Sequence, residues 1–309
     1  MKRQHNFLIG IEGGGTKSTA VITDSRGKIL ARSNGMATNP NTVGFEIAAK
    51  VCFRLISECC KKANCVLKEI SSVVIGTAGA GSKTNQSKLK KILHSYCVKK
   101  NIHPTIIITS DAHIALAGAL GNESGIIMIA GTGAIVFGRN HDSQIFRIGG
   151  WGKILGDDGS GFAIARDAVK EVVSSFDKKM EATALTKSAL KYFGAKSVPD
   201  LPSKIANGKK ELSSFSPRVI ALAQKKDFRS LFVVEFHCNA LLQQLQLACN
   251  HFPNIHKLPL VLLGGLLENE NFYSQMLKDK IEQYFPQLEI QKQKFPSAYG
   301  AILLSMKTK

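Results

Sequence analysis

The stretch FLIGIEGGGTKSTAVIT, residues 7–23, decides the fold. Residues 7–11 form a short apolar run, three glycines then interrupt it, and residues 18–23 are β-branched and alternating. This pattern predicts two strands joined by a glycine turn. Residues 24–27 form a second turn, and residues 28–33 predict a third strand. We therefore expect antiparallel strands at the start of a sheet.

The same strand–glycine turn–strand pattern occurs again later in the chain. Residues 125–130 and 134–139 predict strands on either side of the turn Gly131-Thr132-Gly133. Between the two strand–turn–strand patterns we expect alternating helices and strands. After the second pattern we expect helices over residues 162–193 and 211–250. Residues 194–207 are the most loop-like stretch. Two similar α/β halves would explain this order.

Bulk properties restrict the class of protein. The 309 residues carry a net charge of +18, which raises the possibility of a nucleic-acid or membrane partner. However, the lysines are scattered as pairs, no five basic residues follow one another, and no uncharged apolar stretch reaches eighteen residues. The apolar run 7–11 is too short for a signal peptide. We expect a soluble, cytoplasmic protein without nucleic-acid or membrane partners.

The cysteines indicate a reducing compartment. There are seven, an odd number, with no CxxC pair and no His/Cys pattern of zinc spacing. Cys59 and Cys60 are adjacent within a predicted helix, where ordinary buried thiols are expected.

The first glycine turn has the chemistry of a phosphate site. Successive backbone N–H groups in such a turn form an anion-binding concavity, and Thr16 and Lys17 add a hydroxyl and a positive charge. Glu12 offers a carboxylate suited to a hydrated Mg²⁺ on phosphate. An ordinary glycine hairpin explains the same residues. The second turn makes the phosphate interpretation stronger, because two such turns would grip a triphosphate from both sides.

Two carboxylate segments are further candidates. Asp111 ends an apolar strand and begins a helix, so it is either a helix N-cap or a base at the carboxyl end of a strand. Residues 149–161, GGWGKILGDDGSG, contain the only tryptophan, six glycines and two adjacent aspartates. Such a loop is costly in backbone entropy, which favours a ligand-binding role over a simple turn. Gly264 and Gly265 follow a predicted strand and would let a flat base or a phosphate approach.

Read together, these segments resemble the sugar kinase/hsp70/actin superfamily. More closely, they resemble the family that contains N-acetylglucosamine kinase, bacterial glucosamine kinase and the BadF/BadG ATPases. GIEGGGTKS is similar to the phosphate-1 loop of that family, IAGTGA to phosphate-2, GGWGKILGDDGSG to the substrate loop and LLGGLLEN to the adenosine motif. The resemblance covers nearly the whole chain.

The resemblance implies a fold and a division of the chain. The fold would be a two-lobed actin/hexokinase-like (ribonuclease H-like) ATPase, each lobe a mixed sheet flanked by helices, with a cleft between. Residues 1–115 would form a small N-terminal lobe, rejoined by a C-terminal helix at 298–309. Residues 116–297 would form the larger lobe, whose long helices are compatible with a homodimer.

The resemblance also implies an ATP- and Mg²⁺-dependent amino-sugar kinase. Asp111 would be the general base for the sugar 6-hydroxyl, and Glu12 would hold Mg²⁺ through water. The sugar would contact Asn39, Gly150, Trp151 and Asp157. The nucleotide would contact Gly13, Gly14, Gly15, Thr16, Lys17, Thr132, Gly133, Gly264 and Gly265.

Departures from the family pattern leave the sugar open. Animal N-acetylglucosamine kinases continue the phosphate-2 loop as GTGSN and carry SGGD in the connecting segment, whereas this chain has GTGAI at 131–135 and TAGA at 77–80. Acetylated and free amino sugars therefore both remain candidates. Two other functions stay open: a BadF/BadG-type ATPase that activates a partner enzyme through an iron–sulfur cluster, and a non-catalytic sugar-sensing regulator.

Overall fold

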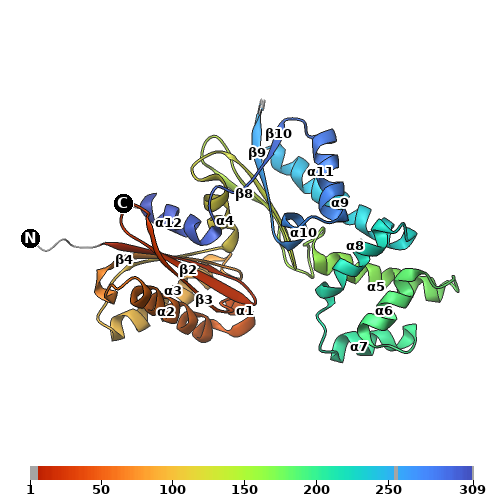
Figure 1. Cartoon of the computed structure of the whole chain (residues 1–309), viewed down its shortest axis with the longest axis horizontal. Helices are drawn as coiled ribbons and strands as arrows, with labels where there is room; N and C mark the ends of the chain where they lie inside the picture. The colour runs from red at the N-terminus through yellow and green to blue at the C-terminus, as the bar shows by residue number, and fades with distance from the viewer. Residues whose placement is uncertain (1–5, 254–256, 308–309) are drawn as a thin grey trace, which may run out of the picture. The chain divides into compact units, whose positions relative to one another are not determined.

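The computed structural model describes residues 6–253 and 257–307, and the chain forms two compact units (Figure 1). Unit 1 is Met1–Glu123 together with Lys292–Lys309, and unit 2 is Ser124–Gln291. Each unit is built around one five-stranded mixed sheet.

The sheet of unit 1 has the order β3-β2-β1-β4-β5. Its strands are β1 (Phe7–Gly13), β2 (Lys17–Thr23), β3 (Ile29–Met36), β4 (Ile70–Thr77) and β5 (Thr105–Thr109). Strands β1, β2 and β3 pair antiparallel, as the sequence predicts, whereas β4 runs parallel to β1 and β5 parallel to β4. The carboxyl ends of β1, β4 and β5 therefore lie at one edge of the sheet.

Helices cover both faces of this sheet. Helices α2 (Phe45–Lys62) and α3 (Lys83–Lys99) bury the larger core on one face. Helices α4 (Asp111–Leu120) and α12 (Ser297–Lys307) lie on the other face (Figure 1). A Cβ at Gly300 of α12 would lie 1.9 Å from the carbonyl oxygen of Ile114, so only glycine allows α12 to approach α4 this closely. Short segments complete the unit: α1 (Pro40–Val43) and the 3₁₀ turn η1 (Leu67–Glu69).

The sheet of unit 2 has the order β10-β9-β6-β7-β8. Its strands are β6 (Gly125–Ala130), β7 (Ala134–Arg139), β8 (Ile145–Gly149), β9 (Leu258–Leu263) and β10 (Leu288–Gln291). Strands β6, β7 and β8 repeat the antiparallel start of unit 1, and β9 runs parallel to β6. The helical part comprises α5 (Gly161–Asp177), α6 (Ala184–Phe193), α7 (Leu201–Asn207), α8 (Ser216–Gln224), α9 (Phe228–Cys249), α10 (Gly265–Glu268) and α11 (Phe272–Tyr284), with 3₁₀ turns η2 (Val198–Asp200) and η3 (Leu212–Phe215).

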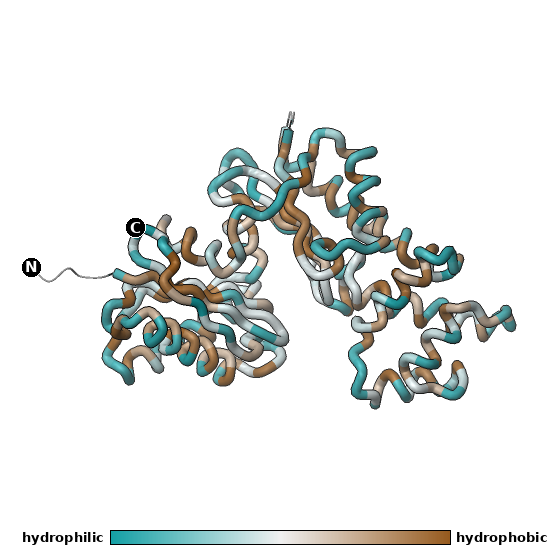
Figure 2. The backbone as a smooth tube through the Cα atoms, in the orientation of Figure 1, coloured by the Kyte–Doolittle hydropathy of each residue, from teal (hydrophilic) through white to brown (hydrophobic). Residues whose placement is uncertain are grey.

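Hydrophobic residues concentrate on the central strands of unit 2 (Figure 2). Strands β6 and β9 contribute Ile126, Met128 and Leu260, none of which is exposed, to a core shared with α5, α8 and α9. Within the described residues, no helix combines the length and apolar character needed to cross a membrane.

The structure differs from the sequence prediction at two places. The division falls after residue 123 and before residue 292, and not at 115 and 297, because α4 continues to Leu120 and packs on α12. The stretch 194–207, predicted as a loop, contains η2 and α7. The prediction was wrong there because Leu201 is fully buried in the core of unit 2, which stabilises a short helix that its own sequence signals weakly.

Candidate functional site

The first glycine turn is a tight connection between β1 and β2. Its closing hydrogen bond runs from Gly14 N to Lys17 O at 2.9 Å, and the N–H groups of Thr38 and Asn39 both donate to Gly14 O, at 3.1 and 3.2 Å. Gly15, Thr16 and Lys17 are exposed. The turn is therefore fixed from behind by the segment after β3, while its tip remains accessible to an anion.

Gly13 has a packing role in the same turn. It is buried, and a Cβ there would lie 1.9 Å from Thr38 Oγ1 and 2.6 Å from Thr77 Oγ1, two hydroxyls that lie 3.2 Å apart. Its carbonyl also accepts a hydrogen bond from Ala78 N at 3.0 Å. Gly13 thus joins the loops after β3 and β4 to the glycine turn.

We expect Gly13→Ala to lower the free energy of unfolding of unit 1 by about 1–3 kcal/mol, because the new methyl group overlaps two fully buried threonines. Gly15→Ala is the matched control, since no atom lies within 4 Å of a Cβ at that position. Urea denaturation of both variants measures the difference. Equal losses in the two variants would contradict the packing role of Gly13.

Asn39 lies beside this turn as the N-cap of α1, where its Oδ1 accepts a hydrogen bond from Asn41 N at 3.0 Å. A Cβ at Gly79 would lie 2.2 Å from the same Oδ1, so the loop after β4 packs directly on Asn39. Asn85 Nδ2 fixes that loop by donating to Gly79 O at 2.8 Å.

Asp111 is the first residue of α4, at the sheet edge where β5 ends. The helix cap is Ser110, whose side chain accepts from His113 N at 3.2 Å, so the N-cap alternative for Asp111 is wrong. Asp111 Oδ1 accepts from the adjacent Ala112 N, at 3.0 Å. The side chain is accessible, yet desolvation by surrounding protein raises the pKa of its carboxyl above the ordinary 3.8. Asp111 is therefore a reachable carboxylate with increased basicity.

Glu12 lies on β1, opposite Gly76 of β4, and is half-buried. A Cβ at Gly10, two residues earlier on the same strand, would contact α12, and one at Gly76 would contact Ile114 of α4. Because side chains alternate along a strand, Glu12 faces the side of the sheet that carries α4. Its carboxylate and Asp111 thus belong to the same side and the same edge of unit 1.

The second glycine turn connects β6 and β7 in unit 2. Gly131 N donates to Gly133 O at 2.9 Å, and Gly131 O accepts from Gly161 N, the first residue of α5, at 2.7 Å. Thr132 is exposed at the tip. The turn is therefore joined to the N-terminus of a 17-residue helix, which is the end that favours an anion.

The glycine-rich loop (Gly149–Gly161) packs against this turn. Asp157, whose φ of 63° is unusual for a residue other than glycine, accepts from Gly152 N through Oδ1 at 3.0 Å. A Cβ at Gly133 would lie 2.8 Å from Asp157 Oδ2. Burial, opposed by the Gly152 N–H and reinforced by the charge of Asp158, raises the pKa of Asp157. The structure thus brings together two segments that the sequence analysis treats as separate motifs.

Trp151 is the exposed part of the loop. Its side chain is 64% exposed, and the guanidinium of Arg147 lies 3.8 Å from the ring centroid. Gly150 has a φ of 67° and packs on Ile135, where a Cβ would lie 2.6 Å from the side chain. An accessible aromatic surface on a backbone fixed by glycine is a suitable platform for a sugar ring.

Gly264 and Gly265 follow β9, directly beside the second glycine turn. In the parallel pair, Ile129 of β6 is opposite Leu263 of β9, so both strands end at the same edge. Gly264 N donates to Glu268 Oε2 at 2.8 Å, which fixes the start of α10. Unit 2 therefore gathers at one edge the predicted nucleotide residues Thr132, Gly133, Gly264 and Gly265 and the predicted sugar residues Gly150, Trp151 and Asp157.

Three side chains that support the glycine-rich loop were missed by the sequence analysis. His237 of α9 accepts a hydrogen bond from Gly159 N at 3.2 Å, and Gln244 of the same helix donates to Asp158 O at 3.2 Å. The Tyr273 hydroxyl of α11 donates to Gly159 O at 2.9 Å. Their separation from the loop, 78 to 114 residues along the chain, leaves no local signal.

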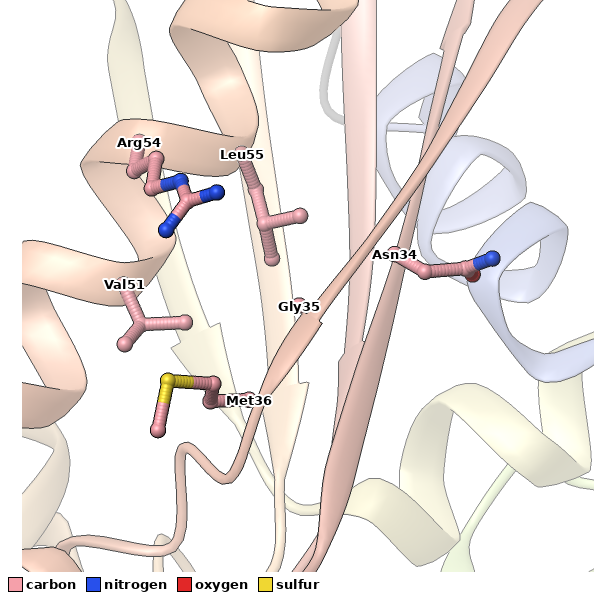
Figure 3. Close-up of a pocket in the computed structure, with 6 residues that line it drawn as sticks. All are labelled: Asn34, Gly35, Met36, Val51, Arg54 and Leu55. Atoms are coloured by element: carbon pink, nitrogen blue, oxygen red, sulfur yellow. The ribbon is translucent and has the colours of Figure 1, made fainter.

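The cavity in Figure 3 lies elsewhere in unit 1. It has a volume of about 280 Å³ and lies between β3 and α2. Val51, Arg54 and Leu55 point into it from the helix and Met36 from the strand, with Asn34 and Gly35 completing the lining. Arg54 is ion-paired with Glu58 at 2.6 Å. None of the predicted site residues lines this cavity.

The described part of the chain contains neither a preformed metal site nor a thiol that is ionised at neutral pH. Within residues 6–253 and 257–307, no three His, Cys, Asp or Glu side chains gather to hold a metal ion. Cys65 is half-buried and the other cysteines are buried, and burial raises the pKa of all seven thiols. Such thiols stay protonated near neutral pH, whereas the ligands of an iron–sulfur cluster are thiolates.

The chain is similar in sequence to a known family and to characterised kinases. The family model described as the BadF/BadG/BcrA/BcrD ATPase family matches residues 9–305. The chain is 33% identical to an N-acetylmuramic acid/N-acetylglucosamine kinase from Clostridium acetobutylicum over 97% of this chain and 98% of that protein. It is 30% identical to an N-acetyl-D-glucosamine kinase from Dictyostelium discoideum over 98% of each.

Solved structures share the fold. A candidate N-acetylglucosamine kinase from Chromobacterium violaceum has a TM-score of 0.76 at 22% identity, covering 98% of this chain and 99% of that chain. A ROK hexokinase from Thermus thermophilus has a TM-score of 0.62 at 16% identity, covering 98% and 100%. The predicted hexokinase-like ATPase fold, with two mixed sheets flanked by helices, is confirmed.

Proposed function

Because the chain belongs to the BadF/BadG/BcrA/BcrD ATPase family, we propose that it is an ATP-dependent kinase that transfers the γ-phosphate to the 6-hydroxyl of an amino sugar. The observation that supports this best is Asp111, an accessible carboxylate of raised pKa at the same edge of the unit 1 sheet as the first glycine turn. The 33% identity to a sugar kinase over 97% of the chain supports the substrate class.

In this proposal Asp111 accepts the proton of the sugar hydroxyl. Its Oδ1 accepts from Ala112 N, and Oδ2 would take the proton. The hydroxyl oxygen forms a bond to the γ-phosphorus, and the bond from that phosphorus to the β–γ bridging oxygen breaks to release ADP. The reaction depends mainly on positioning and charge stabilisation, for which the accessible N–H groups of the two glycine turns are suited.

The residues present fit a Mg²⁺ ion that is bound mainly by phosphate and water. Glu12 is a half-buried carboxylate of unit 1, and the described residues offer no cluster of three ligands that would hold the ion without nucleotide. Glu12 would hold Mg²⁺ through water, and the ion would neutralise charge on the phosphates. Asn39, Gly150, Trp151 and Asp157 would bind the sugar.

The experiment is an ADP-release assay with Mg·ATP against glucosamine, N-acetylglucosamine, N-acetylmuramic acid, N-acetylmannosamine, glucose and no sugar. We expect turnover that depends on one or more amino sugars, with little ATP hydrolysis when sugar is omitted. Sugar-independent hydrolysis would instead favour a partner-activating ATPase, and no turnover with any sugar would favour a sensor. Either result would overturn the proposal.

A further inference from the structure

A buried polar cluster lies beneath the glycine-rich loop of unit 2. The peptide of Gly159 is bound on both sides: His237 Nδ1 accepts from its N–H at 3.2 Å, and Tyr273 donates to its carbonyl at 2.9 Å. Gly159 has a φ of 92°, and a Cβ there would lie 2.4 Å from Leu241. No larger residue can take its place, so Gly159 is a point of close approach between the loop and α9, next to the hydrogen bond from Gln244 to Asp158 O.

The hydrogen bond from Gly159 fixes the protonation state of His237. A backbone N–H can only donate, so Nδ1 must be unprotonated and the neutral imidazole carries its proton on Nε2. Nε2 lies 3.1 Å from Asp167 Oδ2 of α5. Asp167 in turn is bound by the Arg166 guanidinium through two bonds of 2.8 Å and by Lys170 at 3.2 Å.

A short path joins His237 to the exposed part of the loop. Ser160 N, next to Gly159, donates to Asp157 O at 3.0 Å. Asp157 Oδ1 accepts from Gly152 N at 3.0 Å, and Gly152 directly follows Trp151. The positions of the Trp151 and Asp157 side chains are therefore linked to the Gly159 contact, which acts together with the hydrogen bond from Gln244 to Asp158 O.

We propose that His237 is a positioning residue that holds the glycine-rich loop only while its imidazole is neutral, and that protonation of His237 releases the loop. A proton on Nδ1 would place two donors, Nδ1–H and Gly159 N–H, against each other in a site from which water is excluded. The buried amide would then lack an acceptor, and the loop would leave α9 to find one in water.

The groups that face His237 set the pH at which its imidazole is protonated and the glycine-rich loop is released. Asp167 of α5 and Asp158 of the loop favour the imidazolium, Arg166 of α5 disfavours it, and Tyr273 of α11 is an uncharged neighbour. Burial outweighs the carboxylates, so the pKa of His237 is lowered from 6.5. The contact is therefore complete above pH 6.5 and is lost as the pH falls through the lowered pKa.

The wild-type protein carries its own probe, because Trp151 is the only tryptophan and lies in the loop. We expect Trp151 fluorescence to be constant from pH 8 to about 6.5 and to change below that range, before far-UV circular dichroism changes. In His237→Asn, Oδ1 replaces Nδ1 as acceptor and does not titrate. We expect this variant to match wild type at neutral pH and to lose the acid transition.

His237→Leu removes the acceptor and should show the acid-state fluorescence already at neutral pH. If either variant fails to fold, hydrogen exchange of the wild-type protein provides the test. After correction for the intrinsic effect of pH on exchange, protection of the peptide covering residues 157–162 should fall in acid, while β6 and β9 should stay protected. The kinetic readout rests on the proposed function: in His237→Leu the KM for the sugar should rise more than kcat falls, with kcat/KM reduced by about 10- to 100-fold.

Three results would overturn the inference. One is a wild-type fluorescence profile without an acid transition, and another is the same transition in His237→Asn, which would show that a group other than His237 causes it. The third is loss of protection throughout unit 2 together with the loop. Absence of sugar turnover would count against the proposed function only, because fluorescence and exchange need neither sugar nor nucleotide.

Discussion

Asp111→Asn should reduce sugar-dependent phosphoryl transfer by about 10²- to 10⁴-fold, the usual contribution of a general base. The amide keeps the acceptor for Ala112 N and the size of the side chain, and Ser110 still caps α4, so unit 1 should fold normally. The KM for ATP should change little, since the substitution removes a proton acceptor and leaves the glycine turns intact. The ADP-release assay with the best sugar measures the effect.

The pH profile provides an independent check on the same residue. Because desolvation raises the pKa of Asp111 from 3.8, kcat/KM of wild type should fall as the pH falls through that raised value, where the carboxyl becomes protonated. The residual activity of Asp111→Asn should lack this decline. Ser110→Ala is a matched control: it removes the helix cap and should cost stability while activity in the folded fraction remains. Full activity of Asp111→Asn would remove Asp111 from the mechanism.

Gly264→Ala should be the most destabilising single substitution at the edge of unit 2. With φ 88° and ψ 156°, Gly264 has a backbone conformation that is essentially restricted to glycine, and a Cβ would lie 2.5 Å from Ala130 O. The obstacle is main chain of β6, which cannot move without disturbing the sheet. We expect a loss of about 3 kcal/mol in the free energy of unfolding of unit 2, together with weaker nucleotide binding.

Gly265→Ala is the control for this prediction. The nearest atom to a Cβ there is Asn269 Nδ2 at 3.9 Å, and the residue is exposed. We expect its stability to remain within about 0.5 kcal/mol of wild type. Urea denaturation gives the stabilities, and titration with ADP gives the nucleotide affinities. If both alanine variants behave alike, the close approach of Gly264 to Ala130 is not what constrains this turn.

The candidate site could be predicted where its signals are local. Glycine turns between alternating strands identify themselves within a few residues, so β6 was predicted with its observed bounds, whereas β1 continues to Gly13, two residues beyond the predicted strand 7–11. Asp111 was selected as a candidate base because it follows an apolar strand, and its capping alternative was wrong since Ser110, one residue earlier, is the cap. The helix α7 was missed because burial of Leu201 in unit 2 stabilises it, which no local pattern reports.

The sequence by itself determined the class of fold, the two glycine turns and the residue types at each strand end, because these depend on periodicity and on backbone conformations that glycine permits. Only the tertiary structure decided which distant residues contact these turns and strand ends. Parallel pairing of β6 with β9 places Gly264 against Ala130, and α9 brings His237 to Gly159 across 78 residues. Such contacts join distant segments by burial and hydrogen bonding, and the spacing of residues along the chain carries no trace of them.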